Sequence, residues 1–541
     1  MRLFAALPAL ILAQSAAAGS TVETMSQADM MLARPSSLAL AEAGRRYNSE
    51  APVPPMCYTA IEGKHNPCYV CHQSSEDRDR PNYMGDGSLQ EAYAFSDAGL
   101  VNHWTNLFVD RSAQVAAIGD DDILTYINQD NYADLPAHLA AQDWAGWMPD
   151  LQGYGEGAAA FDDVGHALDG SGWVAFVYKP QPSTFWPTNG STDDVLIRLP
   201  QAFRTDADGL PSRDIYTVNL ALLELAFQDL EAISLPPVDE VEIGADIDGD
   251  GVLGIAHHIQ RRDTFLGGAM HDPVTRMLYP EGTEFLHSVR YVGVSPEGEI
   301  TTPHRMKELR YMVKSRFYTP SALASLYGNE NQEKIDENLP RYIDLGDRGM
   351  DTGFGWTLLG FIEAADGSLR PQTNEEQFFC RGCHSTVGAT LDQTWAFPRK
   401  LPGVQGWGYI DLKLMTDVPN KGQAMGEIAT YLERAGGADE FRSNTEMRAL
   451  WFHADGRVNH DAMAGKTVHE LITPSVDRAL ALNKAYRVIV MEQSFVYGRD
   501  ATITPPVNVH AEIDSMTAPT LPPEYRYAHD IRLEWPDAAQ R

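Results

Sequence analysis

The 541-residue chain has few cysteines, few basic residues and no long apolar segment beyond its first residues. Its five cysteines are odd in number and too sparse for a disulfide scaffold. Lys and Arg number 42 against 75 Asp and Glu, and the resulting net charge of −33 repels phosphate backbones and anionic lipid surfaces. We therefore expect no nucleic-acid partner, whereas basic protein partners suit this charge.

Several sequence signatures of enzymes are also missing. There is no G-x-S-x-G nucleophile motif and no phosphate-binding loop, and the acidic residues are scattered along the chain. His469-Glu470 lacks the second histidine of a zinc protease motif. With 43% hydrophobic, 9% aromatic and 22% charged residues, the composition is that of an ordinary folded protein and excludes a largely disordered chain.

Residues 1–18 have the pattern of a secretory signal peptide. Arg2 precedes an apolar run from Leu3 to Ala13, and small residues lead to a predicted cleavage site after Ala18. Pro8 interrupts a stretch that is too short for a membrane anchor, and no cysteine follows the cleavage site to carry a lipid. The sequence predicts export to the periplasm without a membrane span.

Four of the five cysteines form two copies of the haem attachment motif C-x-x-C-H. In this motif each thiol forms a thioether to the porphyrin, and the following histidine is the proximal ligand of the iron. A thioredoxin-like redox pair or a zinc site also uses C-x-x-C, but neither requires the histidine. The haem-binding residues are predicted to be Cys68, Cys71 and His72 in the first motif, and Cys380, Cys383 and His384 in the second.

These motifs carry a resemblance to the bacterial diheme c-type cytochromes. The segment FFCRGCHSTVG, residues 378–388, looks like the haem attachment segment of a cytochrome c domain. The resemblance implies two covalently bound haem c groups. Diheme peroxidases and rubber oxygenases share the two sites with closer spacing, whereas residues 73–379 separate the motifs here.

Hydrophobic patterns predict an α+β multidomain fold, in which mainly helical cytochrome c-like haem regions flank a mixed, strand-containing insert. The first haem domain is placed at 19–150, the insert at 151–340 and the second haem domain at 341–541. Predicted strands are 173–178, 195–199 and 288–292, and predicted helices are 218–230, 425–434, 445–452 and 475–495.

The sixth ligands of the two irons decide between electron transfer and catalysis, because an open position admits small molecules. His103 is the distal candidate for the first haem and Met415 for the second. Further candidates are His65 and Met84 for the first haem, and Met425, Met447, His287 and His304 for the second.

Asp246, Asp248 and Asp250 alternate as in the first half of a calcium loop, with Gly251 at the turn. The second half differs, because His257 stands where a helix–loop–helix site has glutamate. A calcium-binding turn and a turn without an ion both agree with the pattern.

Cys57 is left over when both haems are attached. It is predicted to be an unpaired thiol, a thiolate ligand of the first haem, as in some sulfur-oxidising diheme cytochromes, or an intermolecular disulfide.

The sequence thus predicts an exported diheme c-type cytochrome that transfers electrons between periplasmic redox partner proteins. The alternative is an oxidoreductase with one catalytic haem, either a peroxidase or an oxidase of small molecules or sulfur compounds. A haem-based sensor or binding protein is the second alternative. No catalytic residue is identified from the sequence.

Overall fold

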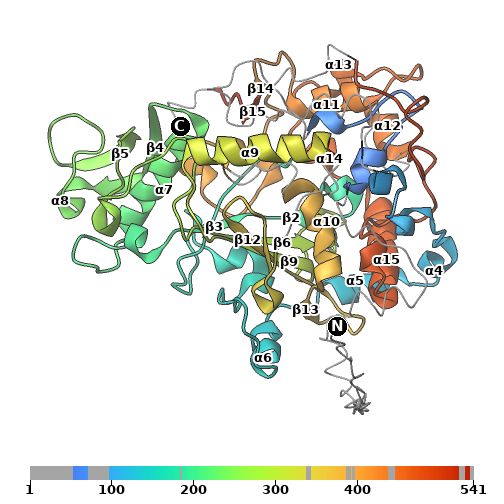
Figure 1. Ribbon diagram of the computed structural model, residues 1–541, viewed down its shortest axis with the longest axis horizontal. Coiled ribbons are helices and arrows are strands. Elements are labelled where there is room, and N and C mark those ends of the chain that lie inside the picture. Colours follow the sequence, from blue (N-terminus) through green and yellow to red (C-terminus); the bar gives the residue numbers. More distant parts are fainter. Residues whose placement is uncertain are drawn as a thin grey trace, which may run out of the picture. The chain divides into compact units, whose positions relative to one another are not determined.

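The computed structural model describes residues 53–70, 95, 97–182, 185–336, 343–384, 392, 397–436, 445–522 and 530–536 (Figure 1). Contacts divide the chain after Ala33, and all described residues belong to the second unit, Arg34–Arg541. The predicted signal peptide, with its cleavage site at Ala18, lies outside the described residues, as do Cys71 and His72 of the first motif.

A nine-stranded antiparallel sheet is the central element. Its order is β1-β3-β6-β9-β12-β11-β10, with β13 beside β12 and β2 beside β6. The strands are β1 (Val174–Ala175), β2 (Thr192–Asp193), β3 (Leu196–Arg198), β6 (Glu284–Arg290), β9 (Met306–Lys314), β10 (Ile343–Asp344), β11 (Met350–Asp351), β12 (Trp356–Glu363) and β13 (Leu369–Pro371).

Strand β12, which pairs with β9, β11 and β13, is buried along its whole length. Because side chains alternate between the two faces of a strand, Trp356 and Leu358 join one apolar cluster while Leu359 and Phe361 join another. The sheet is therefore covered on both faces at its centre. A continuous apolar run of this kind is typical of a fully buried strand.

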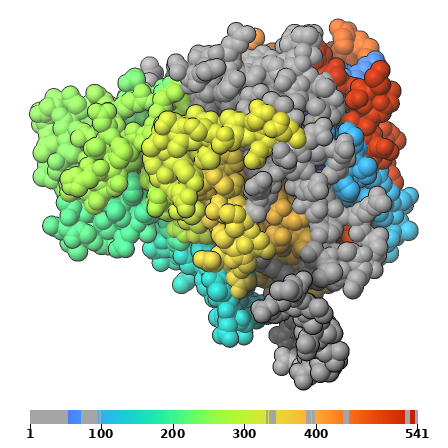
Figure 2. All heavy atoms as spheres, in the orientation of Figure 1, coloured from blue at the N-terminus to red at the C-terminus, as the bar shows by residue number. Residues whose placement is uncertain are grey.

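Helices and three two-stranded sheets accompany the large sheet. Helix α9 lies on the surface (Figure 2). The small sheets pair β4 (Ala232–Asp239) with β5 (Ile255–Gln260), β7 (Gly293–Val294) with β8 (Ile300–Thr301), and β14 (Asn420–Lys421) with β15 (Asp530–Leu533). The described α-helices are α4 (Ser112–Ala116), α5 (Asp120–Ile127), α6 (Leu135–Ala140), α7 (Arg213–Gln228), α8 (Glu240–Ile243), α9 (Pro320–Ile335), α10 (Asn374–His384), α11 (Glu427–Ala435), α12 (Thr445–Trp451), α13 (His460–Met463), α14 (Val468–Ile472) and α15 (Val476–Glu492).

The predicted fold class, mainly helical cytochrome c-like regions around an insert, is wrong. The large sheet dominates the described part of the chain, and it crosses the boundary drawn at residue 340, because β12 pairs with β9 along seven residues. The apolar run 356–363 signals a buried strand, but the prediction gave this region to a helical domain.

Individual elements were predicted more reliably than their assembly. The expected strands at 173–178, 195–199 and 288–292 contain or overlap β1, β3 and β6, and the expected helices correspond to α7, α11, α12 and α15. Helix α15 begins after Ser475, whose hydroxyl accepts a hydrogen bond from the backbone N–H of Arg478 at 3.3 Å. Local patterns therefore placed these elements, and long-range strand pairing decided the architecture.

Candidate functional site

The second C-x-x-C-H motif ends helix α10, which follows β13 directly. A capping box starts this helix: the Glu376 backbone N–H donates to the Thr373 hydroxyl at 3.0 Å, and the Glu376 carboxylate accepts from the Thr373 N–H at 2.8 Å. Arg370 donates two hydrogen bonds to the same carboxylate, at 2.8 and 2.7 Å. The start of the helix is thus fixed to β13 by local, charge-assisted contacts.

Cys380, Cys383 and His384 line one cavity of about 210 Å³. Their spacing of three and four residues places them on the same face of α10. Pro54, Tyr178 and Phe185 contribute apolar surface to other parts of the wall. The motif therefore presents two thiols and an imidazole to a mainly apolar space.

One face of the sheet forms the opposite wall of this cavity. Residues on neighbouring strands stand in register: His287 of β6 is opposite Arg310 of β9, and Arg310 is opposite Gly360 of β12. A Cβ atom at Gly360 would lie 2.5 Å from the Gln372 side chain, so the glycine leaves room for that side chain. The cavity residues on this face of β6, β9 and β12 are Phe285, His287, Arg310, Met312, Leu358 and Gly360.

His287 and Arg310, in this wall, each lie beside a carboxylate. The Nε2 atom of His287 lies 3.3 Å from the Asp193 Oδ2, and Nε of Arg310 donates to Glu308 Oε2 at 2.9 Å. Phe185 lies between them, with its ring 5.7 Å from the His287 ring and 4.9 Å from the Arg310 guanidinium carbon. An imidazole beside a carboxylate has a defined orientation, which is the arrangement found around metal-bound histidines.

Burial keeps the donor groups of the second motif neutral. It lowers the pKa of His384 to about 3, with the positive charge of Arg310 acting in the same direction. Burial also raises the pKa of the Cys383 thiol to about 11, assisted by the neighbouring Cys380. A neutral imidazole has a lone pair on one ring nitrogen, which is the form that binds a metal.

The described part of the first motif lies near this cavity despite its distance in sequence. Cys68 begins a short 3₁₀ helix, Cys68–Val70, and its N–H donates to Asn66 Oδ1 at 3.1 Å. Gln181 lines the cavity of the second motif and donates to the Val70 carbonyl at 3.2 Å. The fold therefore brings together two motifs that residues 73–379 separate in the chain.

Two consecutive residues connect the surroundings of the motifs. Phe185 lines the cavity at Cys380 and Cys383, whereas Trp186 is fully buried in an apolar cluster that contains Cys68. Met415 is also fully buried in this cluster. Met415 and Cys68 thus belong to one buried cluster, whereas the sequence analysis named Met415 as a distal candidate for the second haem.

His103, assigned to the first motif, is half-buried and precedes Trp104, whose ring lies 5.3 Å from that of Phe379 in the second motif. Cys57 belongs to the same apolar cluster as Trp104 and Phe379. The described cysteines Cys57, Cys68, Cys380 and Cys383 form no disulfide. Neither His103 nor Met415 lines the second-motif cavity.

The sequence indicated part of this site and missed the rest. His287 was one of several histidine candidates, and only the register of β6 and β9 places it across from the motif. No sequence signal identifies Asp193 or Arg310 as cavity residues, because strand pairing and not a local motif places them there.

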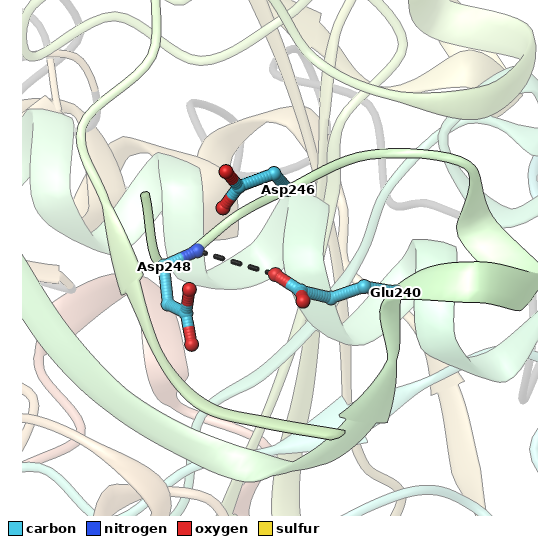
Figure 3. Close-up of side chains that lie close together, drawn as sticks. All are labelled: Glu240, Asp246 and Asp248. Carbon is cyan, nitrogen blue, oxygen red and sulfur yellow. Dashed lines mark hydrogen bonds between the residues drawn. The ribbon is translucent and has the colours of Figure 1, made fainter. Parts of the chain in front are cut away.

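The acidic loop brings together Glu240, Asp246 and Asp248, whose carboxylate oxygens lie within 4.8 Å of one another (Figure 3). Glu240 is buried and accepts hydrogen bonds from the N–H groups of Ile247 at 2.7 Å and Gly254 at 3.0 Å. These bonds lower the pKa of Glu240, and the bond from Gly254 contributes most.

Asp250, which the calcium pattern included, is not part of this group and accepts from the Val252 N–H at 2.7 Å. Glu240 was missed because it precedes the pattern and lies at the start of α8. Calcium binding at this loop remains a prediction.

No helix among the described residues combines the length and apolar character needed to span a membrane.

Comparison with known proteins gives a family but no activity. A family described as "-like lipoprotein" matches residues 42–464. An "Uncharacterized lipoprotein" of Aquifex aeolicus (strain VF5) is 30% identical over 515 residues, which cover 84% of this chain and 86% of the relative. No solved structure is significantly similar to the chain.

Neither description names a cytochrome, a haem or electron transfer. The expected labels cytochrome c, haem and electron transfer are therefore wrong as descriptions of the family. The description that the comparisons give is lipoprotein. Membership of a lipoprotein family agrees with the expected export of the protein. On the extent of both matches, the chain belongs to the family described as "-like lipoprotein".

Proposed function

We propose that this protein is an exported redox protein that carries two covalent haems and passes electrons between periplasmic partners. The observation that carries the proposal is the cavity in which Cys380, Cys383 and His384 face a second imidazole, that of His287. Two thiols and two imidazoles around a mainly apolar space are a donor set that would suit a covalently attached haem.

The residues of the second motif fit such a group. Cys380 and Cys383 would hold it through thioethers, His384 would be the proximal ligand and His287 the distal ligand. A haem bound there supplies a one-electron iron couple. Asp193 lies beside the His287 ring, and the walls of the cavity are mainly apolar.

The first motif is proposed to hold the second haem. Its described residues include Cys68, which shares a buried cluster with Met415. A methionine sulfur is a common sixth ligand and raises the reduction potential relative to a second histidine. Because Met415 lies in the same buried cluster as Cys68, we propose it as the sixth ligand at the first motif.

The partners are proposed to be redox proteins with basic docking surfaces. A net charge of −33 attracts positively charged proteins over distances of about a Debye length and speeds their encounter. Electron transfer to such a partner should therefore slow as salt is added.

One observation favours a second candidate, an oxidoreductase in which the second haem is catalytic. If His287 does not bind the iron, the cavity presents an imidazole oriented by Asp193 and a guanidinium, that of Arg310. These groups suit proton transfer to or from a small molecule such as a peroxide. The spin state of the second haem separates the two candidates.

The test begins with haem stoichiometry and spectra of the wild-type protein. The pyridine haemochrome assay should give two haems per chain, and ferric spectra should show low-spin iron without carbon monoxide binding to the reduced protein. His287→Ala should make one haem high-spin and open to carbon monoxide. The matched control is His304→Ala, since His304 Nδ1 contacts the Gly155 carbonyl and lies outside the cavity lining.

Fewer than two haems per chain would contradict the proposal. High-spin iron in the wild type, together with peroxide turnover, would instead support the catalytic candidate. Carbon monoxide binding without turnover would point to a haem-based sensor.

A further inference from the structure

A second, smaller cavity of about 20 Å³ adjoins the cavity of the second motif. Phe185, Arg310 and Phe379 line both. Its volume suits one water-sized polar group. The small cavity is therefore positioned to bind a polar substituent of a ligand in the large cavity.

Basic residues surround this small cavity. Lys307, Arg310 and Arg499 line it together with two carboxylates, those of Glu308 and Asp500. The lining thus has one more positive than negative charge, within a chain whose net charge is −33. Buried charge that exceeds its counter-charge is unfavourable, and an anion in the cavity would relieve it.

The carboxylate of Glu308 contacts two guanidinium groups, those of Arg310 and Arg499. Arg310 reaches Glu308 Oε2 with Nε and Nη2, both at 2.9 Å, and Arg499 Nη1 contacts the same oxygen at 2.7 Å. Glu308 is 3% exposed, and the two guanidiniums lower its pKa despite its burial. Among the described residues, no acceptor lies within hydrogen-bond distance of Arg310 Nη1, so this cavity residue retains donor capacity.

Lys307 adds a third cation at the same place. Its ammonium donates to the Gly190 carbonyl at 2.6 Å and to the Ser191 hydroxyl at 3.1 Å, and it lies 4.3 Å from the centre of the Tyr486 ring. These contacts hold the Lys307 ammonium at the wall of the small cavity.

We propose that this small cavity binds a carboxylate group of the haem attached to Cys380 and Cys383, with Lys307, Arg310 and Arg499 as the binding residues. The inference rests on the proposed function. A haem carries carboxylate side chains on its edge, and the shared walls at Phe185 and Phe379 connect the two cavities. Arginine is well suited to this role, because its planar donors match a carboxylate.

The test is redox-induced infrared difference spectroscopy on protein whose haem carboxylates carry ¹³C, introduced with a labelled haem precursor. In Arg310→Gln, the label-sensitive carboxylate bands of one haem should shift from their wild-type positions. Arg310→Lys should lie closer to wild type because it retains the charge. Lys314→Gln is the control, since Lys314 lies on the same strand but pairs with Asp392 at 2.7 Å outside both cavities.

The pyridine haemochrome assay is done on every variant and keeps the two proposals apart. Loss of haem from the wild type contradicts the proposed function, whereas unshifted label-sensitive bands in haem-loaded Arg310→Gln overturn the carboxylate site alone. If Arg310→Gln fails to fold, Lys307→Gln is measured in its place with the same expectation. A wild-type spectrum that changes when formate is added would show that the cavity takes a free anion, which also overturns the inference.

Discussion

His287 and Arg310 stand directly opposite each other on the antiparallel strands β6 and β9, and both side chains line the cavity of the second C-x-x-C-H motif. Their carboxylate partners, Asp193 and Glu308, come from β2 and β9. The register therefore sets an imidazole and a guanidinium side by side in front of His384. A shift of one residue in this pairing would turn one of them to the other face of the sheet.

Removing a thiol of the second motif should remove one haem. In Cys383→Ala, which lacks a thioether position, haem content measured by pyridine haemochrome should fall from two per chain toward one. Cys57→Ser is the matched control, because Cys57 lies outside both motifs, and it should retain two. Equal haem content in Cys383→Ala and wild type would contradict attachment at this motif.

Met415→Leu should change one haem and leave the other intact. Leucine preserves most of the packing in the cluster around Cys68 but provides no sulfur ligand, so the spectral band of methionine-bound iron should disappear. Met463→Leu is the control, because Met463 is buried in the same cluster. A change that is the same in both variants would indicate packing rather than ligation.

Glu240→Ala should destabilise the loop between β4 and β5. The buried carboxylate accepts from the N–H groups of Ile247 and Gly254, and leaving these donors unsatisfied should cost about 2–3 kcal/mol. Urea unfolding measures the loss. Asp250→Ala is the comparison, since Asp250 is exposed and should cost much less.

Calcium at the same loop is tested separately. If Asp246 and Asp248 hold the ion, a chelator should lower the melting temperature of the wild type and have no effect on Asp248→Ala. An equal response of the two proteins would exclude calcium at this loop.

Stability should fall as the pH drops from 7 to 5, in part because of His166. Burial lowers the pKa of His166 to about 4, whereas the unfolded value is near 6.5. Between these values the unfolded state binds the proton and the folded state does not, so the free energy of unfolding decreases by about 2 kcal/mol from pH 7 to pH 5. His166→Gln removes this titration. Urea unfolding at both pH values should show a smaller difference for the variant, and identical differences would refute the assignment.

Cell fractionation tests the location. The sequence predicts release with the soluble periplasmic fraction after cleavage near Ala18, although the family is one of lipoproteins. Mass spectrometry of the purified chain should show an N-terminus close to Gly19 and no lipid. Retention in the membrane fraction until detergent is added would instead indicate an anchor.

The sequence by itself determined the local chemistry. The two C-x-x-C-H motifs are visible because covalent attachment and ligation need residues at fixed short spacing, and α10 then presents Cys380, Cys383 and His384 on one face. Strands such as β3 and helices such as α7 follow from hydrophobic period and capping, which are also local.

Only the tertiary structure decided what surrounds these motifs. Pairing of β12 with β9 extends the sheet past residue 340, and the register of β6 with β9 brings His287 to the cavity. Gln181, which lines the second-motif cavity, donates a hydrogen bond to Val70 of the first motif. Glu240 accepts one from Ile247 in the acidic loop. Each of these relations depends on contacts between residues far apart in the chain or outside a recognised pattern. Their free energy comes from burial and strand pairing over the whole fold, and no short stretch of sequence contains that information.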